Sequence, residues 1–242
     1  MFNKSKQLKT SDVIDPVTRA SLNNLALPGS RWGEYKDHKY NIRLWSKFFF
    51  QIFEPTDSKV LDFGCGATWC STIGTTLGYQ IINLDVDSRE VRENFGLYAQ
   101  ILNQEIIYYN GDKIPFADNS FSAIIAKASI MKLEGSEFSR SISELIRISQ
   151  QHAIWYISSK GMYRSFINEL ALHAELGQKI KDKKIRFIPW TWNVLEFQRS
   201  KSPFTEVDFL YNCREKLRKK ALFRFVKKYK HKFLGSRGHH VI

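Results

Sequence analysis

A turn that combines an acidic side chain with two glycines is the part of this chain best suited to chemistry. Residues 60–63 have the apolar, partly β-branched character of a strand that is covered on both faces. Asp62 lies in this strand, and Gly64 and Gly66 follow it. The glycines permit a sharp turn in which a ligand can approach the main chain. A tight strand-to-helix turn without a ligand needs the same glycines, so both interpretations stay open here.

A second carboxylate lies further along the chain. Residues 79–87 form another apolar segment with strand character, and Asp85 lies near its end. In a βαβ unit, a carboxylate at the tip of the second strand accepts hydrogen bonds from the two ribose hydroxyls of a nucleotide. Strand patterns recur at residues 105–109 and 123–126. The spacing therefore predicts a parallel sheet with a nucleotide-type site at one edge.

Three motifs follow consecutive predicted strands, and their order and spacing resemble a known family. They are Leu61-Asp62-x-Gly64-x-Gly66, then Leu84-Asp85, then Gly111-Asp112-x-x-Pro115-Phe116-x-x-x-Ser120-Phe121. The chain resembles the class I S-adenosylmethionine-dependent methyltransferases, in particular the type 11 branch, over roughly residues 55 to 160. Residues 143–148 resemble that family's helix before strand five, and residues 152–158 resemble strand five. The resemblance implies an α/β fold with a Rossmann-like, doubly wound and mostly parallel sheet.

The resemblance also implies a cofactor, S-adenosyl-L-methionine, and the residues that would bind it. Asp62 would receive the methionine ammonium, and the two glycines would leave room for the methionine portion. Asp85 would hold the ribose. The adenine would lie against Val86 and would be met by Asp112 and its neighbour. The implied set is Asp62, Gly64, Gly66, Asp85, Val86, Asp112 and Lys113. Asp62 and Asp112 could instead be turn or N-cap residues that contact no ligand.

Several positions depart from the family pattern. Thr68 stands where the third glycine is usual, with the bulky Trp69 beside it, and Met131-Lys132 replaces a common His-His pair. The cofactor half of the pattern therefore matches better than the acceptor half. A nicotinamide site is a weaker alternative, because Trp69 occupies the third position of Gly-x-Gly-x-x-Gly and Asp62 would repel a pyrophosphate.

Methyl transfer from a sulfonium needs little from the protein beyond alignment, which in well-oriented reactions supplies about 7–11 kcal/mol. A general base is needed only where the acceptor must lose a proton. Lys127, Lys132, Glu134 and His173 are available by position, but the sequence assigns none of them, so the catalytic residues are unknown at this stage.

The chain divides into four predicted parts. These are a leader and N-terminal cap helices (1–54), the cofactor-binding core (55–160), an acceptor-side region that completes the sheet (161–212) and a basic C-terminal extension (213–242). Aromatic residues from Trp32 to Phe49 recur at helical spacing, which predicts the cap. Within the acceptor side we expect a helix over 163–176 that ends near Gly177, a strand over 185–192 interrupted by Pro189, and a last strand over 205–211.

The net charge is +13 and the sequence pI is about 9.6, with the excess of positive charge late in the chain. Residues 214–233 pattern as a basic amphipathic helix. This helix could dock on the core, lie on an anionic membrane surface or bind nucleic acid. The start of the chain lacks the apolar core of a signal peptide, so we expect a cytoplasmic protein, with peripheral attachment at the inner membrane face as the membrane alternative. Cys65, Cys70 and Cys213 suggest neither a disulfide framework nor a metal site.

The sequence thus favours an S-adenosylmethionine-dependent methyltransferase that acts on a small-molecule, glycan or lipid-linked acceptor. Two alternatives stay open. One is a non-catalytic binding or scaffold protein that has the same fold, which Thr68, Met131 and Lys132 favour. The other is an RNA methyltransferase that uses the basic extension, although nucleic acid is the less favoured partner. The oligomeric state is not predicted.

Overall fold

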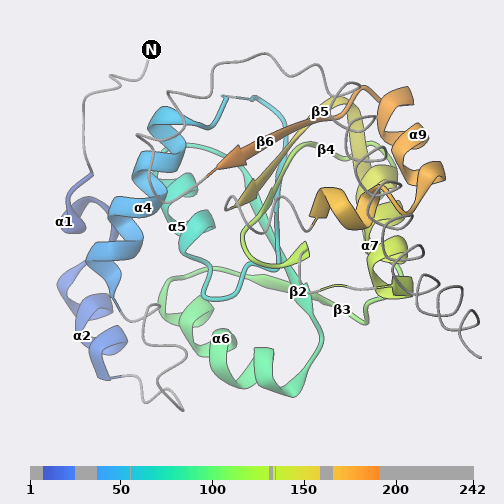
Figure 1. The fold of residues 1–242 in the computed structure, drawn as a ribbon. Coiled ribbons are helices and arrows are strands. Elements are labelled where there is room, and N and C mark those ends of the chain that lie inside the picture. The colour runs from blue at the N-terminus through green and yellow to red at the C-terminus, as the bar shows by residue number, and fades with distance from the viewer. Residues whose placement is uncertain are drawn as a thin grey trace, which may run out of the picture.

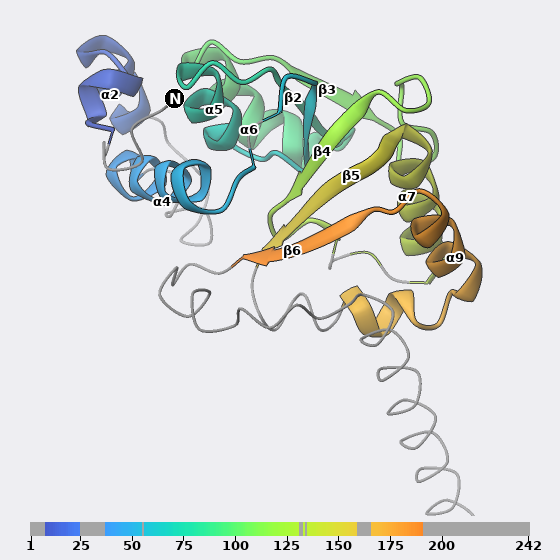
Figure 2. The same cartoon turned by 90° about the horizontal axis from the view of Figure 1, so that it is seen from above.

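The computed structural model describes residues 8–24, 37–54, 56–130, 133, 135–158 and 166–190. Its centre is a sheet in the order β3-β2-β1-β4-β5-β6, in which every pair of neighbouring strands is parallel. Figures 1 and 2 show helices on both sides of this sheet. The predicted doubly wound, Rossmann-like fold is confirmed. Its strands are β1 (Val60–Phe63), β2 (Ile81–Val86), β3 (Ile106–Tyr109), β4 (Phe121–Ala126), β5 (Ser149–Ser158) and β6 (Arg186–Trp190).

The helices form two layers. They are α1 (Thr10–Val13), α2 (Pro16–Asn24), α4 (His38–Gln51), α5 (Trp69–Thr76), α6 (Arg89–Ile101), α7 (Gly135–Ile148) and α9 (Ala174–Asp182). Residues 166–170 are also helical. The helices α4, α5 and α6 pack in one hydrophobic cluster, and α7 and α9 pack in a second one with residues 166–170.

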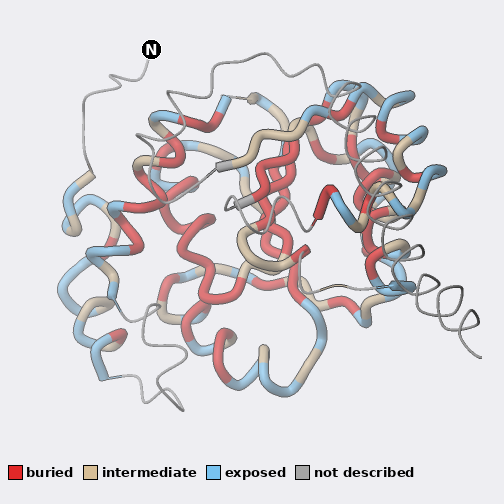
Figure 3. The backbone as a smooth tube through the Cα atoms, in the orientation of Figure 1, coloured by how far each residue is buried: buried red, intermediate tan, exposed pale blue. Residues whose placement is uncertain are grey.

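The strands divide their side chains between these two clusters. In β4, Ala123 and Ile125 belong to the first cluster, whereas Ile124 and Ala126 belong to the second. Successive strand residues point to opposite faces, so a strand covered on both faces is apolar at almost every position. The buried tube segments at the centre of Figure 3 are these strands and the inner sides of the helices. All four residues of β1 are buried, and Asp62 is the polar one among them.

The described part of the predicted N-terminal cap contains the helix α4. The side chain of Asp37 accepts a hydrogen bond from the Tyr40 backbone N–H at 2.8 Å, which caps the start of α4. Trp45, Phe48 and Phe49 are buried on the inner side of this helix. The predicted part of the cap around Trp32 lies outside the described residues.

The prediction beyond strand five is partly wrong. A helix was expected over 163–176 with its end near Gly177, but the helical segment at 166–170 ends in a turn, and α9 continues through Gly177 to Asp182. Leu176 and Ile180 explain this continuation, because both are buried in the second cluster one helical turn apart. The left-handed backbone that a C-terminal glycine would provide occurs at Lys184 instead, with φ of 53°.

Two strand boundaries also differ from the expectation. The fifth strand begins at Ser149 rather than at His152, and His152 has a positive φ of 63° inside it. The predicted strand over 185–192 is β6, which lies at the sheet edge and pairs only with β5 among the described strands. An edge position tolerates Pro189, since proline cannot donate to a second neighbour. The expected strand over 205–211 and the basic helix over 214–233 lie outside the described residues, and the four-part division of the chain stays a prediction.

Candidate cofactor site

The candidate site lies where the strand order changes direction, between β1 and β4. In open α/β sheets, ligands bind outside the carboxyl ends of the strands at such a point. Asp62 and the turn from Gly64 to Gly66 lie at the carboxyl end of β1, and Lys127 follows β4 directly. The helix α5 begins just after the turn. The topology therefore brings the first predicted motif to the expected edge of the sheet.

The glycine turn has a left-handed backbone at three places: Gly64 (φ 71°), Gly66 (φ 54°) and Thr68 (φ 56°). A Cβ atom at Gly64 would lie 2.3 Å from Cβ of Ser129, in the loop after β4. The Ser129 hydroxyl donates to the Phe63 carbonyl at 2.6 Å, which fixes that loop against the turn. Close packing therefore accounts for Gly64 without any ligand.

The carboxylate of Asp85 joins the end of β2 to this turn. Its Oδ2 accepts a hydrogen bond from the Gly66 backbone N–H at 2.9 Å, and its Oδ1 accepts one from the Val86 N–H at 2.8 Å. The Cys65 thiol also donates to Oδ2, at 4.0 Å. Val86 follows with 41% of its surface exposed, an unusual exposure for an apolar side chain at the end of a buried strand.

Asp62 is the most perturbed carboxylate at the site. It is 1% exposed, and its Oδ2 has no hydrogen-bond partner among the described residues. Burial raises the pKa of Asp62 to about 7, and the negative charge of Asp85 adds to this rise, while the positive charge of Lys127 and a hydrogen bond with Cys70 oppose it. A buried carboxylate oxygen without a donor favours a cationic partner. The chemistry of this position fits the ammonium group of an amino-acid ligand.

The space beside Asp62 is small. The hollow has a volume of about 20 Å³, enough for about one water molecule and far below the ~300–1,000 Å³ of usual ligand pockets. Trp69 is 2% exposed and packs in the core. The Nζ of Lys127 lies 5.8 Å from the ring centroid of Trp45, on α4. The lining residues are Asn41, Trp45, Asp62, Gly64, Cys65, Ala67, Trp69, Cys70 and Lys127. The groups fit a cofactor, but the volume requires side chains or α4 to move before one can enter.

Asp112, in the third predicted motif, lines a different hollow from Asp62. Asp112 is exposed, and its Oδ1 accepts a hydrogen bond from Arg140 Nη1 on α7 at 3.2 Å. It lines a separate, open hollow of about 650 Å³ beside α7 and α9. Lys113 is exposed too. The structure thus brings Asp62, the glycines and Asp85 together, whereas Asp112 lines a different hollow.

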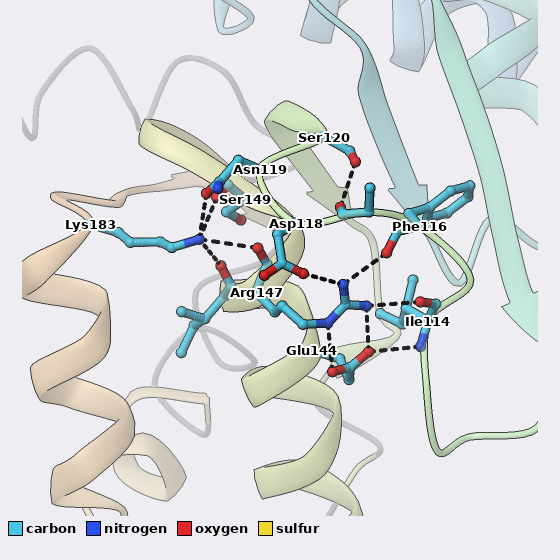
Figure 4. Close-up of polar contacts among 11 residues, drawn as sticks. Ile114, Phe116, Asp118, Asn119, Ser120, Glu144, Arg147, Ser149 and Lys183 are labelled. Atoms are coloured by element: carbon cyan, nitrogen blue, oxygen red, sulfur yellow. Dashed lines mark hydrogen bonds and ion pairs between the residues drawn. The ribbon is translucent and has the colours of Figure 1, made fainter.

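A polar network holds the loop that follows the third motif (Figure 4). The guanidinium of Arg147 donates to the carbonyls of Ile114 and Phe116 at 2.9 and 2.8 Å, and it pairs with Asp118 and Glu144 at 2.7 Å. Glu144 in turn accepts from the Ile114 backbone N–H at 2.9 Å. We call these five residues the Arg147 clamp. The clamp fixes the chain between β3 and β4 to α7.

Of the two candidate bases that the structure describes, Lys127 and His173, one lies at the hollow. Lys127 is among its lining residues. His173 is the N-cap residue of α9, where its ring stacks against Phe138 at 5.7 Å between centroids. Lys132 and Glu134 lie outside the described residues.

Sequence analysis missed three residues that contribute to the hollow or its turn. Asn41 and Trp45 reach the hollow from α4, and Ser129, in the loop after β4, packs against Gly64 in the turn. Trp45 belongs to the aromatic pattern of the cap, so that pattern was the available signal. The sequence contains no signal for Ser129, because the contact between Ser129 and Gly64 joins distant parts of the chain.

A comparison with known protein families agrees with this fold. Residues 61–157 match the family Methyltransf_11, described as "Methyltransferase domain". This match supports a class I S-adenosylmethionine-dependent methyltransferase domain of the type 11 kind in this region, and it implies S-adenosylmethionine as the cofactor. No curated protein matches the chain.

Solved structures resemble the chain only distantly. The PH0226 protein from Pyrococcus horikoshii OT3 is 20% identical, with a TM-score of 0.42 over 65% of this chain and 71% of that one. A SAM-dependent methyltransferase from Aquifex aeolicus is 21% identical, with a TM-score of 0.34 over 63% and 70% of the two chains. A chain from a structure described as "Conversion of a Disulfide Bond into a Thioacetal Group during Echinomycin Biosynthesis" is 19% identical, with a TM-score of 0.35 over 42% of this chain and 43% of that one. This chain therefore spans less than half of the last protein. These likenesses are too weak to add to the family match.

Proposed function

We propose that this chain transfers a methyl group from S-adenosylmethionine to an acceptor at the hollow between β1, α4 and α5. The observation that carries the proposal is Asp62, a buried carboxylate with an unpartnered oxygen at the carboxyl end of β1. In this proposal Asp62 receives the ammonium of the methionine portion, and Asp85 receives the ribose hydroxyls. Gly66 is held against Asp85, so the turn and the ribose site form one unit.

The cofactor, when bound, supplies both the methyl group and its sulfur leaving group. The protein must then orient the donor and exclude water. Asp62 orients it through a charge-assisted hydrogen bond in a region of low dielectric. Trp45 and Trp69, both buried, keep water from the methionine end.

The narrow hollow implies that α4 acts as a lid in the proposed function. Its inner side contributes Asn41 and Trp45 to the closed hollow, and Figure 1 shows α4 beside α5 at the site. The cofactor enters only if these side chains move outward. This lid belongs to the predicted N-terminal cap, whose remaining part lies outside the described residues.

A second candidate function is a binding or scaffold protein without catalysis. The volume of about 20 Å³ and the burial of Trp69 favour it, because a hollow that stays closed admits no cofactor. The Asp62 carboxylate opposes it, since a scaffold gains nothing from an unpaired buried acid.

Calorimetric titration with S-adenosylmethionine and with its demethylated product separates the two candidates. We expect the wild-type chain to bind both ligands, Asp62→Asn to bind neither measurably, and Asp57→Asn, which removes an exposed carboxylate before β1, to bind like the wild type. No binding by the wild-type chain would instead favour the scaffold.

The acceptor is a further proposal. A small-molecule, glycan or lipid-linked acceptor is the prediction from sequence, and incubation of a cell extract with methyl-labelled cofactor tests it by the size and solubility of the labelled product. Label only in protein or in nucleic acid would contradict that prediction. Within the described residues, no helix has the length and apolarity that crossing a membrane requires.

A further inference from the structure

The outer side of α4 carries a row of basic residues. Lys39, Arg43 and Lys47 follow one another at intervals of four residues, so they share one side of the helix. Lys39 and Arg43 are exposed and Lys47 is half-buried. The helix contains no aspartate or glutamate between His38 and Gln51. We call these three residues the α4 basic row.

The α4 basic row has no partner in the part of the chain that the structure describes. Each described salt bridge and side-chain hydrogen bond involves other residues. On α6, by contrast, Arg89 pairs with Glu93 at 2.6 Å. Three cations in line that pair with no carboxylate among the described residues therefore mark a site of positive charge.

The row is also unfavourable for the helix that carries it. Lys39 lies in the first turn of α4, where the helix dipole disfavours a positive charge. Arg43 has a like charge four residues before it and another four residues after it, and such pairs destabilise a helix. Local stability therefore does not account for the row, and local conflicts of this kind are expected at functional surfaces.

Further positive charge lies at the N-terminal end of the row. Burial lowers the pKa of His38, the nearby charges of Arg19 and Lys39 lower it further, and Asp37 alone opposes them. Arg19 belongs to α2, so two helices contribute to the same positive region. Its Nε atom is buried without a hydrogen-bond partner among the described residues.

We propose that the α4 basic row binds the phosphate backbone of a single-stranded nucleic acid. The row spans about 12 Å, from the rise of 1.5 Å per helical residue. Each strand of duplex DNA places a phosphate about every 3.4 Å, so a single strand that keeps this stacked spacing would run about four nucleotides beside the row, and a more extended strand fewer. A straight, exposed row suits an extended polyanion better than a small anion, which needs an enclosing pocket.

A membrane surface fits the row less well. Interfacial helices insert an apolar side into the lipid, and their affinity depends on that buried apolar area. The apolar side of α4 is already buried in the first hydrophobic cluster, where Trp45, Phe48 and Phe49 pack. Only charge remains to attract a membrane, whereas phosphate contacts alone hold many proteins on nucleic acid.

The inference goes beyond the proposed function, because it concerns the outer side of α4 and not the hollow. Asn41 and Trp45 close the hollow from the opposite side of the same helix. A strand bound to the row would therefore lie on the helix that we propose as the lid.

Salt-dependent binding of the full chain to a single-stranded RNA of about 12 nucleotides tests the proposal, since single-strand sites cover about 4–16 nucleotides. The test variant carries K39Q, R43Q and K47Q together. The matched control carries K59Q, K181Q and K184Q, which remove three exposed lysines elsewhere. Both variants keep the C-terminal basic residues and have the same net charge.

We expect the test variant to lower the slope of log K against log salt by about 2, from ~0.7 per phosphate contact, and to weaken binding by about ten- to a hundredfold at 0.1 M salt. The control variant should keep a larger share of both the salt slope and the RNA affinity of the wild type. Single-stranded DNA of equal length should show the same loss, because the contacts are to phosphate. Equal losses in test and control variants would overturn the proposal, as would a loss for anionic vesicles without one for RNA.

Two further measurements keep the outcome clear. Thermal unfolding should place the test variant at or above the wild type, because it removes unfavourable charges from α4. A lower unfolding temperature would show that the row serves the fold, against the proposal. Cofactor titration of the same variant is independent of RNA, so a failure of the methyltransferase proposal is seen separately.

Discussion

Replacing Asp62 by asparagine should stabilise the protein increasingly as the pH rises. The carboxylate of Asp62 is 1% exposed, and burial, together with the charge of Asp85, raises its pKa from 3.8 to about 7. The folded protein therefore binds the Asp62 proton more tightly than the unfolded chain does. Asparagine has nearly the same shape and never ionises, so it removes the energy of placing this negative charge in the core.

The sign and size follow from the two pKa values. Below about pH 3.8, Asp62 is protonated in both states and does not affect stability. Between pH 3.8 and 7 the unfolded chain ionises first, so stability is lost as the pH rises, and the loss levels off above pH 7. A shift of about 3 pKa units at 1.36 kcal/mol per unit gives a total of about 4 kcal/mol. Of this, about 2 to 3 kcal/mol falls between pH 5 and pH 8.

Urea unfolding at pH 5 and pH 8 measures this difference. The free energy of unfolding of Asp62→Asn, relative to the wild type, should increase by about 2 to 3 kcal/mol between these two pH values. The free energy of unfolding of Asp62→Asn should also be lower by a constant amount at both pH values. The amide N–H has no acceptor in the core, and an unsatisfied buried donor costs about 1–3 kcal/mol. Asp57→Asn, at an exposed position, should stay within about 0.5 kcal/mol at both pH values. A difference that is the same at pH 5 and pH 8 would refute the reasoning.

Three further predictions use other parts of the site. Asp85→Ala should weaken the free energy of cofactor binding by about 1–2 kcal/mol in calorimetry, and it should lower the free energy of unfolding by about 1–2 kcal/mol in urea. The variant removes the acceptor for the Gly66 N–H. An unchanged cofactor affinity would contradict the place of Asp85 at the ribose. Gly64→Ala should destabilise by at least about 2 kcal/mol more than Gly78→Ala, because both have positive φ but only Gly64 lacks space for a Cβ; equal losses would show that the backbone alone matters. Arg147→Lys should lower the free energy of unfolding by about 1–3 kcal/mol, because the bidentate and carbonyl contacts of Arg147 are lost. The control Arg140→Lys should lower it by about 0.5 kcal/mol. Equal effects of the two variants in urea unfolding would argue against the clamp.

The sequence was sufficient for the parts of the fold that depend on local patterns. The strands near residues 60–63, 79–87, 105–109 and 123–126 are found with small shifts at their ends, because runs of apolar residues between turns define buried strands. The parallel order follows from the alternation of strands and helices. Gly177 misled the prediction because the apolar spacing from Leu176 to Ile180 outweighs the preference of glycine for helix ends.

The candidate site was predictable in its residue types but not in its contacts. The positions of Asp62 and Asp85 at neighbouring strand ends follow from topology. The hydrogen bond from Gly66 to Asp85, and the closure of the hollow by Trp45, depend on how separate elements pack, which no local pattern encodes. The outward direction of Asp112 has the same origin, since Arg140 on α7 draws its carboxylate to another surface.

The electrostatics of the hollow also limit its chemistry. Cys65 and Cys70 line it beside Asp62, and burial together with the charges of Asp62 and Asp85 raises the pKa of the Cys65 thiol well above its usual value. Burial and the Asp62 charge do the same for Cys70. A thiol that stays protonated is a poor nucleophile, so neither cysteine suits a covalent intermediate. Under the proposed function the acceptor must therefore provide the attacking atom itself, and the protein contributes orientation and the exclusion of water. The same negative surroundings that suppress the thiols favour a cationic sulfonium and ammonium, which connects the unreactive cysteines to the proposed ligand.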